Sequence, residues 1–126
     1  MVVFILGTIS FKELKEALIL DSIFLIDLRT RSEIASKGKI PKSFSIPIEE
    51  LFHGALEMTN KNFHNRYGFK KPIKSVELIV FDSRGKYATQ AGKYLKSLGY
   101  QQVKVYKGGF DDWLVNGGEI SHFGKH

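Results

Sequence analysis

The chain has 126 residues, of which 43% are hydrophobic and 25% charged, and its formal net charge is +6. This length and balance are typical of one globular domain, and no apolar run approaches the roughly 20 residues of a membrane-spanning helix. There is no cysteine, which excludes disulfides, thiolate metal sites and a cysteine nucleophile within the chain.

The opening residues predict an edge strand followed by a helix. Residues 2–6 are an apolar run that is too short for a signal-peptide core and has no basic stretch before it. Ser10 and Glu13 form a capping box, in which the serine accepts a backbone amide and the glutamate reaches back, so a helix should begin beside them. Because no targeting signal precedes the domain, we expect a cytoplasmic protein.

Two short strands flank a second predicted helix. Residues 24–27 are a short apolar run, as in a buried strand. Thr30 and Glu33 form another capping box, and Gly38 suits the end of the helix that they open. Residues 44–46 then predict a short strand that ends at a proline.

The middle of the chain predicts two helices, a strand and a longer helix. Apolar side chains are spaced for one helix over residues 48–56 and for a shorter one over 60–67. Residues 76–81 form the strongest strand candidate and lead into a glycine-containing loop at 82–86. Residues 88–98 again show helical spacing.

The chain closes with a strand and a short helix. Residues 103–106 alternate as a strand does, and residues 110–116 predict a helix anchored by Trp113. Strands and helices that alternate in this way predict an α/β fold with a parallel sheet and helices on both faces. We expect one domain over residues 1–118 and a C-terminal tail over 119–126.

The loop after residue 81 is the best candidate for a site. In open parallel sheets, sites form beyond the carboxyl ends of the strands. A tight loop there turns several backbone N–H groups inward, near the positive end of the next helix dipole. Such a loop is a generic cradle for anions, so weak anion binding is expected.

This loop resembles the active-site loop of rhodanese-like domains. In that family the strand ends in cysteine, followed by two variable residues, glycine, a variable residue and commonly arginine. The corresponding residues are Asp82, Ser83, Arg84, Gly85, Lys86 and Tyr87. The stretch from Asp27 to Arg29 likewise resembles the family's Asp-x-Arg motif.

Further family motifs recur in order over residues 8–118. The stretch 38–41 resembles Gly-His-Ile-Pro, with Lys39 in place of histidine, and residues 108–110 match the Gly-Gly-aromatic ending. Residues 55–67 are similar to the small single-domain thiosulfate-sulfurtransferase-like proteins. The resemblance implies a three-layer fold with a central five-stranded parallel sheet.

Aspartate at position 82 changes the chemistry that the resemblance implies. Family members carry sulfur on a cysteine as a persulfide, and a carboxylate cannot form one. Tyr87 also removes the usual arginine donor. We therefore predict that the chain is not an enzyme but a pseudo-sulfurtransferase, a binding or regulatory module for an unknown protein partner. Asp82 should instead accept the loop amides and cap the next helix.

Other interpretations stay open. The alternative is an enzyme with altered chemistry, such as a residual sulfurtransferase or an aspartate-dependent hydrolase, although the loop offers no second acid. Nucleic acid is an unlikely partner because the lysines are scattered. Asp27 and Arg29 are predicted to pin loops rather than to act as an acid–base pair.

No cofactor or metal is expected. His122 and His126 have a helical spacing suited to a metal, but they lie in a glycine-containing tail and are predicted to be solvated. Arg84 and Lys86 are predicted to point to solvent.

Overall fold

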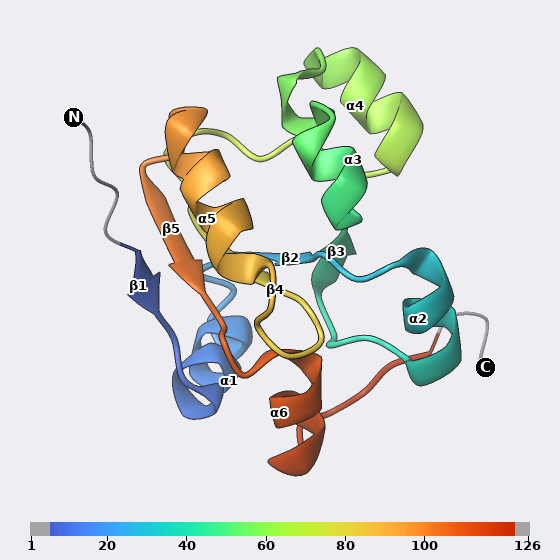
Figure 1. Ribbon diagram of the computed structural model, residues 1–126, viewed down its shortest axis with the longest axis vertical. Coiled ribbons are helices and arrows are strands. Elements are labelled where there is room, and N and C mark those ends of the chain that lie inside the picture. The colour runs from blue at the N-terminus through green and yellow to red at the C-terminus, as the bar shows by residue number, and fades with distance from the viewer. Residues whose placement is uncertain (1–5, 123–126) are drawn as a thin grey trace.

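A single parallel sheet organises the chain (Figure 1). The computed structural model describes residues 6–122. Its five strands are arranged in the order β1-β5-β4-β2-β3, and every pairing is parallel. The strands are β1 (Gly7–Thr8), β2 (Phe24–Asp27), β3 (Ser43–Ser45), β4 (Glu77–Phe81) and β5 (Gln102–Val105). The predicted α/β fold with a five-stranded parallel sheet is thus confirmed.

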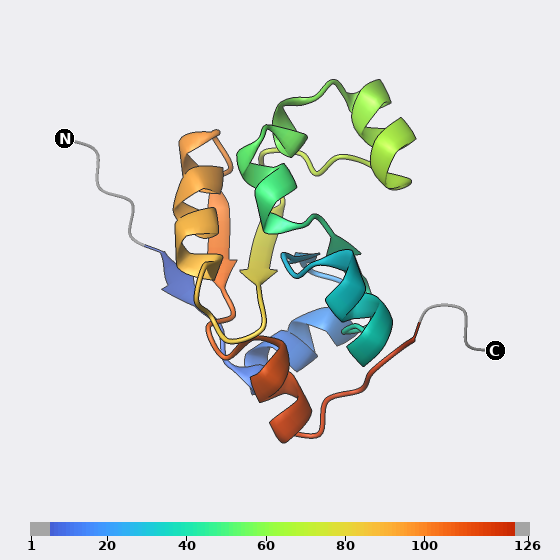
Figure 2. The ribbon, with the colours of Figure 1, turned by 45° about the vertical axis from the view of Figure 1, so that its right-hand side comes forward.

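Helices cover both faces of this sheet (Figures 1 and 2). They are α1 (Phe11–Ile19), α2 (Arg31–Lys37), α3 (Ile48–Phe52), the 3₁₀ turn η1 (Ala55–Glu57), α4 (Asn60–Tyr67), α5 (Ala88–Ser97) and α6 (Gly109–Val115). Helices α3, α4 and α5 contribute to one apolar core, and α1 and α6 contribute to the other. No helix within residues 6–122 has the length and apolar character needed to cross a bilayer.

Strand β4 separates the two cores. Leu78 and Val80 belong to the core under α5, whereas Ile79 and Phe81 belong to the core under α1 and α6. All four side chains are fully buried. A strand that is covered on both faces favours an unbroken apolar run, which explains why this segment gave the clearest strand pattern in the sequence.

Both predicted capping boxes are present. The Ser10 hydroxyl accepts the Glu13 amide at 3.1 Å, and the Glu13 carboxylate accepts the Ser10 amide at 3.0 Å. Thr30 and Glu33 make the same reciprocal pair at the start of α2, and Gly38 ends that helix. These local contacts fix where α1 and α2 begin.

The helix predicted over residues 48–56 is broken. Helix α3 ends at Phe52 and η1 begins at Ala55, because Gly54 between them takes a left-handed conformation with φ of 99°. The apolar spacing continues across this break, so periodicity alone did not reveal it. Most of the strand predicted over residues 2–6 lies outside the described residues, and the first described strand begins at Gly7.

One carboxylate ties three helices together beside the sheet. Glu50 of α3 accepts hydrogen bonds from Arg31 of α2, and from Arg66 at 3.2 Å and the Tyr67 hydroxyl at 2.8 Å, both on α4. The bonds from Arg31, with those from Tyr67 and Arg66, outweigh the effect of burial and lower the pKa of Glu50 from 4.5 to about 2. The cluster therefore needs an ionised glutamate.

We predict that Glu50→Gln weakens the fold more at neutral pH than in acid. Because folding lowers the Glu50 pKa, its contribution is present above pH 4.5 and is lost as the pH falls toward 2. Arg31 and Arg66 are more than half exposed, so solvent screening limits the neutral-pH effect to about 1 kcal/mol. Urea unfolding of both proteins at pH 7 and pH 3 measures this, with the exposed Glu49→Gln as the control. A difference that stays constant with pH would contradict the role of Glu50.

Candidate functional site

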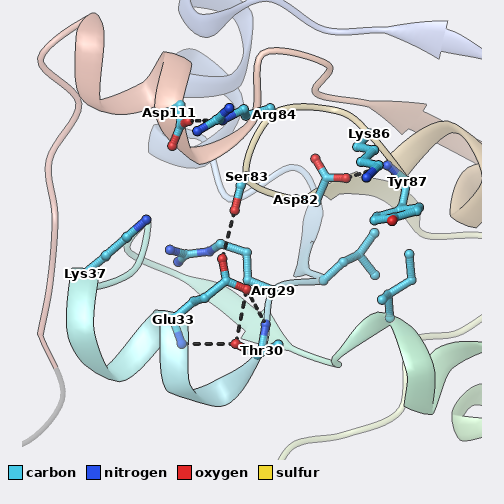
Figure 3. A pocket seen from close by; sticks show the side chains of 12 residues that line it. Arg29, Thr30, Glu33, Lys37, Asp82, Ser83, Arg84, Lys86, Tyr87 and Asp111 are labelled. Carbon is cyan, nitrogen blue, oxygen red and sulfur yellow. Dashed lines mark hydrogen bonds and ion pairs between the residues drawn. The ribbon is translucent and has the colours of Figure 1, made fainter.

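A cavity of about 450 Å³ opens beyond the carboxyl ends of β2 and β4 (Figure 3). The backbone amide of Leu28 donates to the Phe81 carbonyl at 2.9 Å, which holds the ends of the two strands together. The cavity is lined by Leu28, Arg29, Thr30, Glu33, Lys37, Ile48, Asp82, Ser83, Arg84, Lys86, Tyr87 and Asp111. Five of the six residues of the predicted loop therefore border it.

The Asp82 carboxylate fills the amide cradle of this loop. One carboxylate oxygen accepts the amide of Gly85, and the other accepts the amides of Tyr87 at 2.7 Å and Ala88 at 3.2 Å. Asp82 is only 7% exposed. Since Ala88 is the first residue of α5, the negative charge also lies at the positive end of that helix. The inward-turned amides predicted from the sequence are present, but the protein's own side chain is their acceptor.

The loop is also held from the side of α6. The Asp82 carbonyl accepts the Phe110 amide at 2.9 Å, and the Ser83 carbonyl accepts the Asp111 amide at 3.0 Å. Gly85 has φ of 84°, and a Cβ atom there would lie 2.3 Å from the Lys107 carbonyl oxygen. Only glycine fits this close approach, so the loop and the turn before α6 form one packed unit.

Asp27 and Arg29 form a buried ion pair at the end of β2. Each side chain is 1% exposed, and Arg29 Nη2 lies 2.8 Å from the Asp27 carboxylate. The same nitrogen donates to the Gly38 carbonyl at 2.9 Å, and the guanidinium stacks 3.7 Å from the centre of the Phe110 ring. Through these contacts the pair holds the end of α2 and the start of α6 against β2, which is the structural role that the sequence predicted for it.

Charged side chains surround the mouth of the cavity. Arg84 and Lys86 are exposed, as predicted, and the Arg84 side chain, which is 83% exposed, also pairs with Asp111 at 2.9 Å. Lys86 Nζ lies 5.1 Å from the centre of the Tyr87 ring, and Tyr87 itself is 45% exposed. Tyr87, at the position where the family motif commonly has arginine, thus gives the cavity a half-exposed aromatic wall.

Helix α2 supplies residues that the sequence did not mark as part of the site. Glu33 accepts the Ser83 hydroxyl at 3.1 Å, and Lys37 lines the cavity one helical turn further on (Figure 3). Burial raises the pKa of Glu33, but hydrogen bonds from Thr30 and Ser83 outweigh it, so this pKa lies below its ordinary value. Glu33 and Lys37 lie four residues apart on a helix that follows the end of β2, and this spacing is the pattern in the sequence that could have indicated their place in the site.

The segment after residue 118 is attached to the domain. Lys39 and Ser121 exchange two backbone hydrogen bonds, of 2.8 and 2.9 Å, and Trp113 Nε1 donates to the Glu119 carbonyl. Across residues 6–122, no three His, Asp or Glu side chains gather in a way that could hold a metal ion. His126 lies outside the described residues.

Comparisons with known proteins agree on one family. Residues 10–116 match the model of the rhodanese-like domain. A rhodanese domain-containing protein of Drosophila melanogaster, CG4456, is 34% identical over 86% of this chain and 97% of its own length. The human thiosulfate:glutathione sulfurtransferase is 36% identical over 85% of this chain and 92% of its own length. The structure of the human single-domain sulfurtransferase TSTD1 has 36% identity and a TM-score of 0.81, covering 86% of this chain and 96% of that one.

These relatives correct one expectation and leave another open. The prediction that the chain is not an enzyme is wrong, because its relatives are named as sulfurtransferases and the lack of a cysteine does not by itself establish inactivity. The compartment stays a prediction, since a relative from Saccharomyces cerevisiae, 34% identical over 78% of this chain and 64% of its own length, is named as mitochondrial.

The ordered motifs, the parallel five-stranded sheet, the loop at the end of β4 and these likenesses lead to the same conclusion. The chain, although it has no cysteine, belongs to the rhodanese-like domain family, in its single-domain thiosulfate sulfurtransferase-like group.

Proposed function

We propose that this chain is a ligand-binding member of the sulfurtransferase family, whose cavity takes a small anion beside a loop that Asp82 holds in place. The observation that carries the proposal is the set of three loop amides that donate to the Asp82 carboxylate. In relatives, as the resemblance implies, these amides hold the charge of sulfur bound to cysteine. Here a carboxylate oxygen lies two bonds from Cβ, as the terminal sulfur of a persulfide does.

The cavity offers the positive charge that an anion needs. Lys37 and Lys86 both line it, and neither forms an ion pair with another residue between positions 6 and 122. Relatives are named for thiosulfate and for glutathione, and both of these are anionic at neutral pH. Because Asp82 already occupies the loop amides, we propose that the ligand binds beside them, between Lys37 and Lys86 (Figure 3).

We also propose that the mouth of the cavity is where the unknown protein partner docks. Tyr87 is half-exposed there, next to Lys86 and the Arg84–Asp111 pair. The alternative of aspartate-dependent hydrolysis is not favoured, since both Asp82 oxygens already accept backbone amides.

The first test is a titration followed by amide NMR. We expect thiosulfate and reduced glutathione to shift the amide signals of residues 82–88 and of Lys37, and we expect Lys86→Gln to weaken binding about two- to fivefold at low salt. Lys12→Gln, a change of the same charge on the exposed face of α1, is the matched control. Binding that weakens equally in both variants would show that the anion responds only to net charge.

A second prediction concerns the loop itself. Asp82→Ala removes the acceptor of three amides, so it should lower the free energy of unfolding by roughly 0.5–2 kcal/mol, the range for the loss of a helix cap. Chemical unfolding measures this, and Asp111→Ala at the exposed rim is the comparison. If Asp82→Ala instead raised the melting temperature without added anion, the carboxylate would be crowded in the loop and not a part of its support.

A third prediction restores the family's nucleophile. In Asp82→Cys, the loop amides and the α5 dipole should favour a thiolate. This thiolate attacks the outer sulfur of thiosulfate, the S–S bond of thiosulfate breaks, and sulfite leaves with the electron pair. We expect mass spectrometry to show a gain of one sulfur, and a larger yield when Tyr87→Arg is added, because arginine is a bidentate donor to oxyanions.

Asp82→Ser is the control for the persulfide experiment, since serine has a shape similar to that of cysteine but contains no sulfur. A folded Asp82→Cys/Tyr87→Arg protein that reacts with a thiol reagent but gains no sulfur would show that the loop has lost the family's geometry.

A further inference from the structure

Lysine side chains gather at the end of the molecule opposite the cavity. They come from the segment that precedes β4 and from the last turn of α5, which lie together at the amino-terminal end of β4 (Figures 1 and 2). This basic surface consists of Lys70, Lys71, Lys74 and Lys96. None of these lysines forms an ion pair with another residue between positions 6 and 122. Lysines that look scattered in the sequence are thus brought together by folding.

Hydrogen bonds fix the parts of the basic surface in place. The buried Tyr100 hydroxyl donates to the Pro72 carbonyl at 2.8 Å, and the Lys74 ammonium lies 4.2 Å from the centre of the Tyr100 ring. The ammonium groups of Lys71, Lys74 and Lys96 each donate to a backbone carbonyl, at distances of 2.7 or 2.8 Å. A carbonyl group carries no net charge. The positive charges are therefore held in position but are not neutralised.

The charges of this surface act on one another. Burial lowers the pKa of Lys71 below its ordinary value, and the charge of Lys74 lowers it further, whereas Glu57 raises it. The two lysines therefore repel each other, and one carboxylate offsets this repulsion only in part. Neighbouring cations of this kind create a positive potential that attracts an anionic partner.

An exposed apolar side chain lies within the basic surface. Ile73 is 61% exposed, and it stands in the chain between Lys71 and Lys74. Single exposed apolar residues are common on proteins, so Ile73 gains its meaning from the lysines on either side of it. Together they present positive charge around an apolar projection.

We propose that this surface docks on an anionic lipid bilayer, with the lysines at the phosphate headgroups and Ile73 entering the interfacial layer. Clusters of about four to eight lysines or arginines are attracted to anionic membranes, and an inserted apolar group adds to the attraction. Protein–protein interfaces, in contrast, are depleted in lysine and have a larger apolar centre. Nucleic acid would offer phosphates to the lysines but no apolar layer to Ile73.

Docking in this way sets the orientation of the whole domain. The basic surface lies at the amino-terminal end of β4, whereas the cavity opens beyond the carboxyl end of the same strand. A docked chain would therefore keep its cavity open to the aqueous phase. The inference is independent of the ligand proposed for that cavity.

Sedimentation with vesicles tests the role of charge. At low salt, we expect the protein to sediment with vesicles of phosphatidylcholine and phosphatidylserine and to stay in solution with phosphatidylcholine alone. Because each lysine should contribute about fivefold to partitioning, Lys70→Gln/Lys74→Gln should weaken it about twentyfold. Lys12→Gln/Lys15→Gln, on the exposed face of α1, removes the same charge and is the matched control. Protein that stayed in solution with both kinds of vesicle, or equal losses in the two double variants, would overturn the proposal.

A fluorescent label tests the insertion of Ile73, and the absence of any other cysteine makes the labelling specific. An environment-sensitive fluorophore on Ile73→Cys should shift its emission to shorter wavelength with the anionic vesicles. The same label on Val115→Cys, 85% exposed at the end of α6, should not. Equal shifts at both positions would overturn the docked orientation. A shift at residue 73 with polyglutamate but not with vesicles would assign the surface to an acidic protein and overturn the membrane proposal.

Discussion

The backbone N–H groups of Gly85, Tyr87 and Ala88 converge on one point at the end of β4, and the Asp82 carboxylate occupies that point. Backbone N–H groups that converge in this way form a concavity that favours a negative charge, and the carboxylate satisfies all three of them. In the family motif, as the resemblance implies, an ionised cysteine supplies that charge. In this chain the charge belongs to the fold and needs no ionised thiol or bound ligand.

The rest of the site is built outward from that loop. The start of α6 donates to the loop carbonyls, and the same turn of α6 places the Phe110 ring against Arg29. Arg29 in turn holds Asp27 and the end of α2 at Gly38. Packed and hydrogen-bonded groups therefore connect the loop to the other side of the cavity.

The sequence predicted what depends on neighbours along the chain. The capping boxes at Ser10 and Thr30 and the buried run of β4 are local patterns, and the contact of Asp82 with its own loop spans only six residues. The hydrogen bond between Ser83 and Glu33 joins positions fifty residues apart, and the contacts of Arg29 with Gly38 and Phe110 depend on α2 and α6 together. Such features follow from tertiary packing, which periodicity does not contain. The error about enzyme activity had a different origin, because one residue excludes one mechanism and not a class of protein.

Asp82 and Tyr87, which differ from the family motif, change the distribution of charge within the cavity. Where the family motif commonly has arginine at the end of the loop, Tyr87 contributes a ring, and where the motif has cysteine, Asp82 contributes a carboxylate. The cations that line the cavity without an ion pair among the described residues are Lys37 of α2 and Lys86 of the loop. The loop differs from the family motif at Asp82 and Tyr87, whereas the Asp27–Arg29 pair matches it and holds the same fold together.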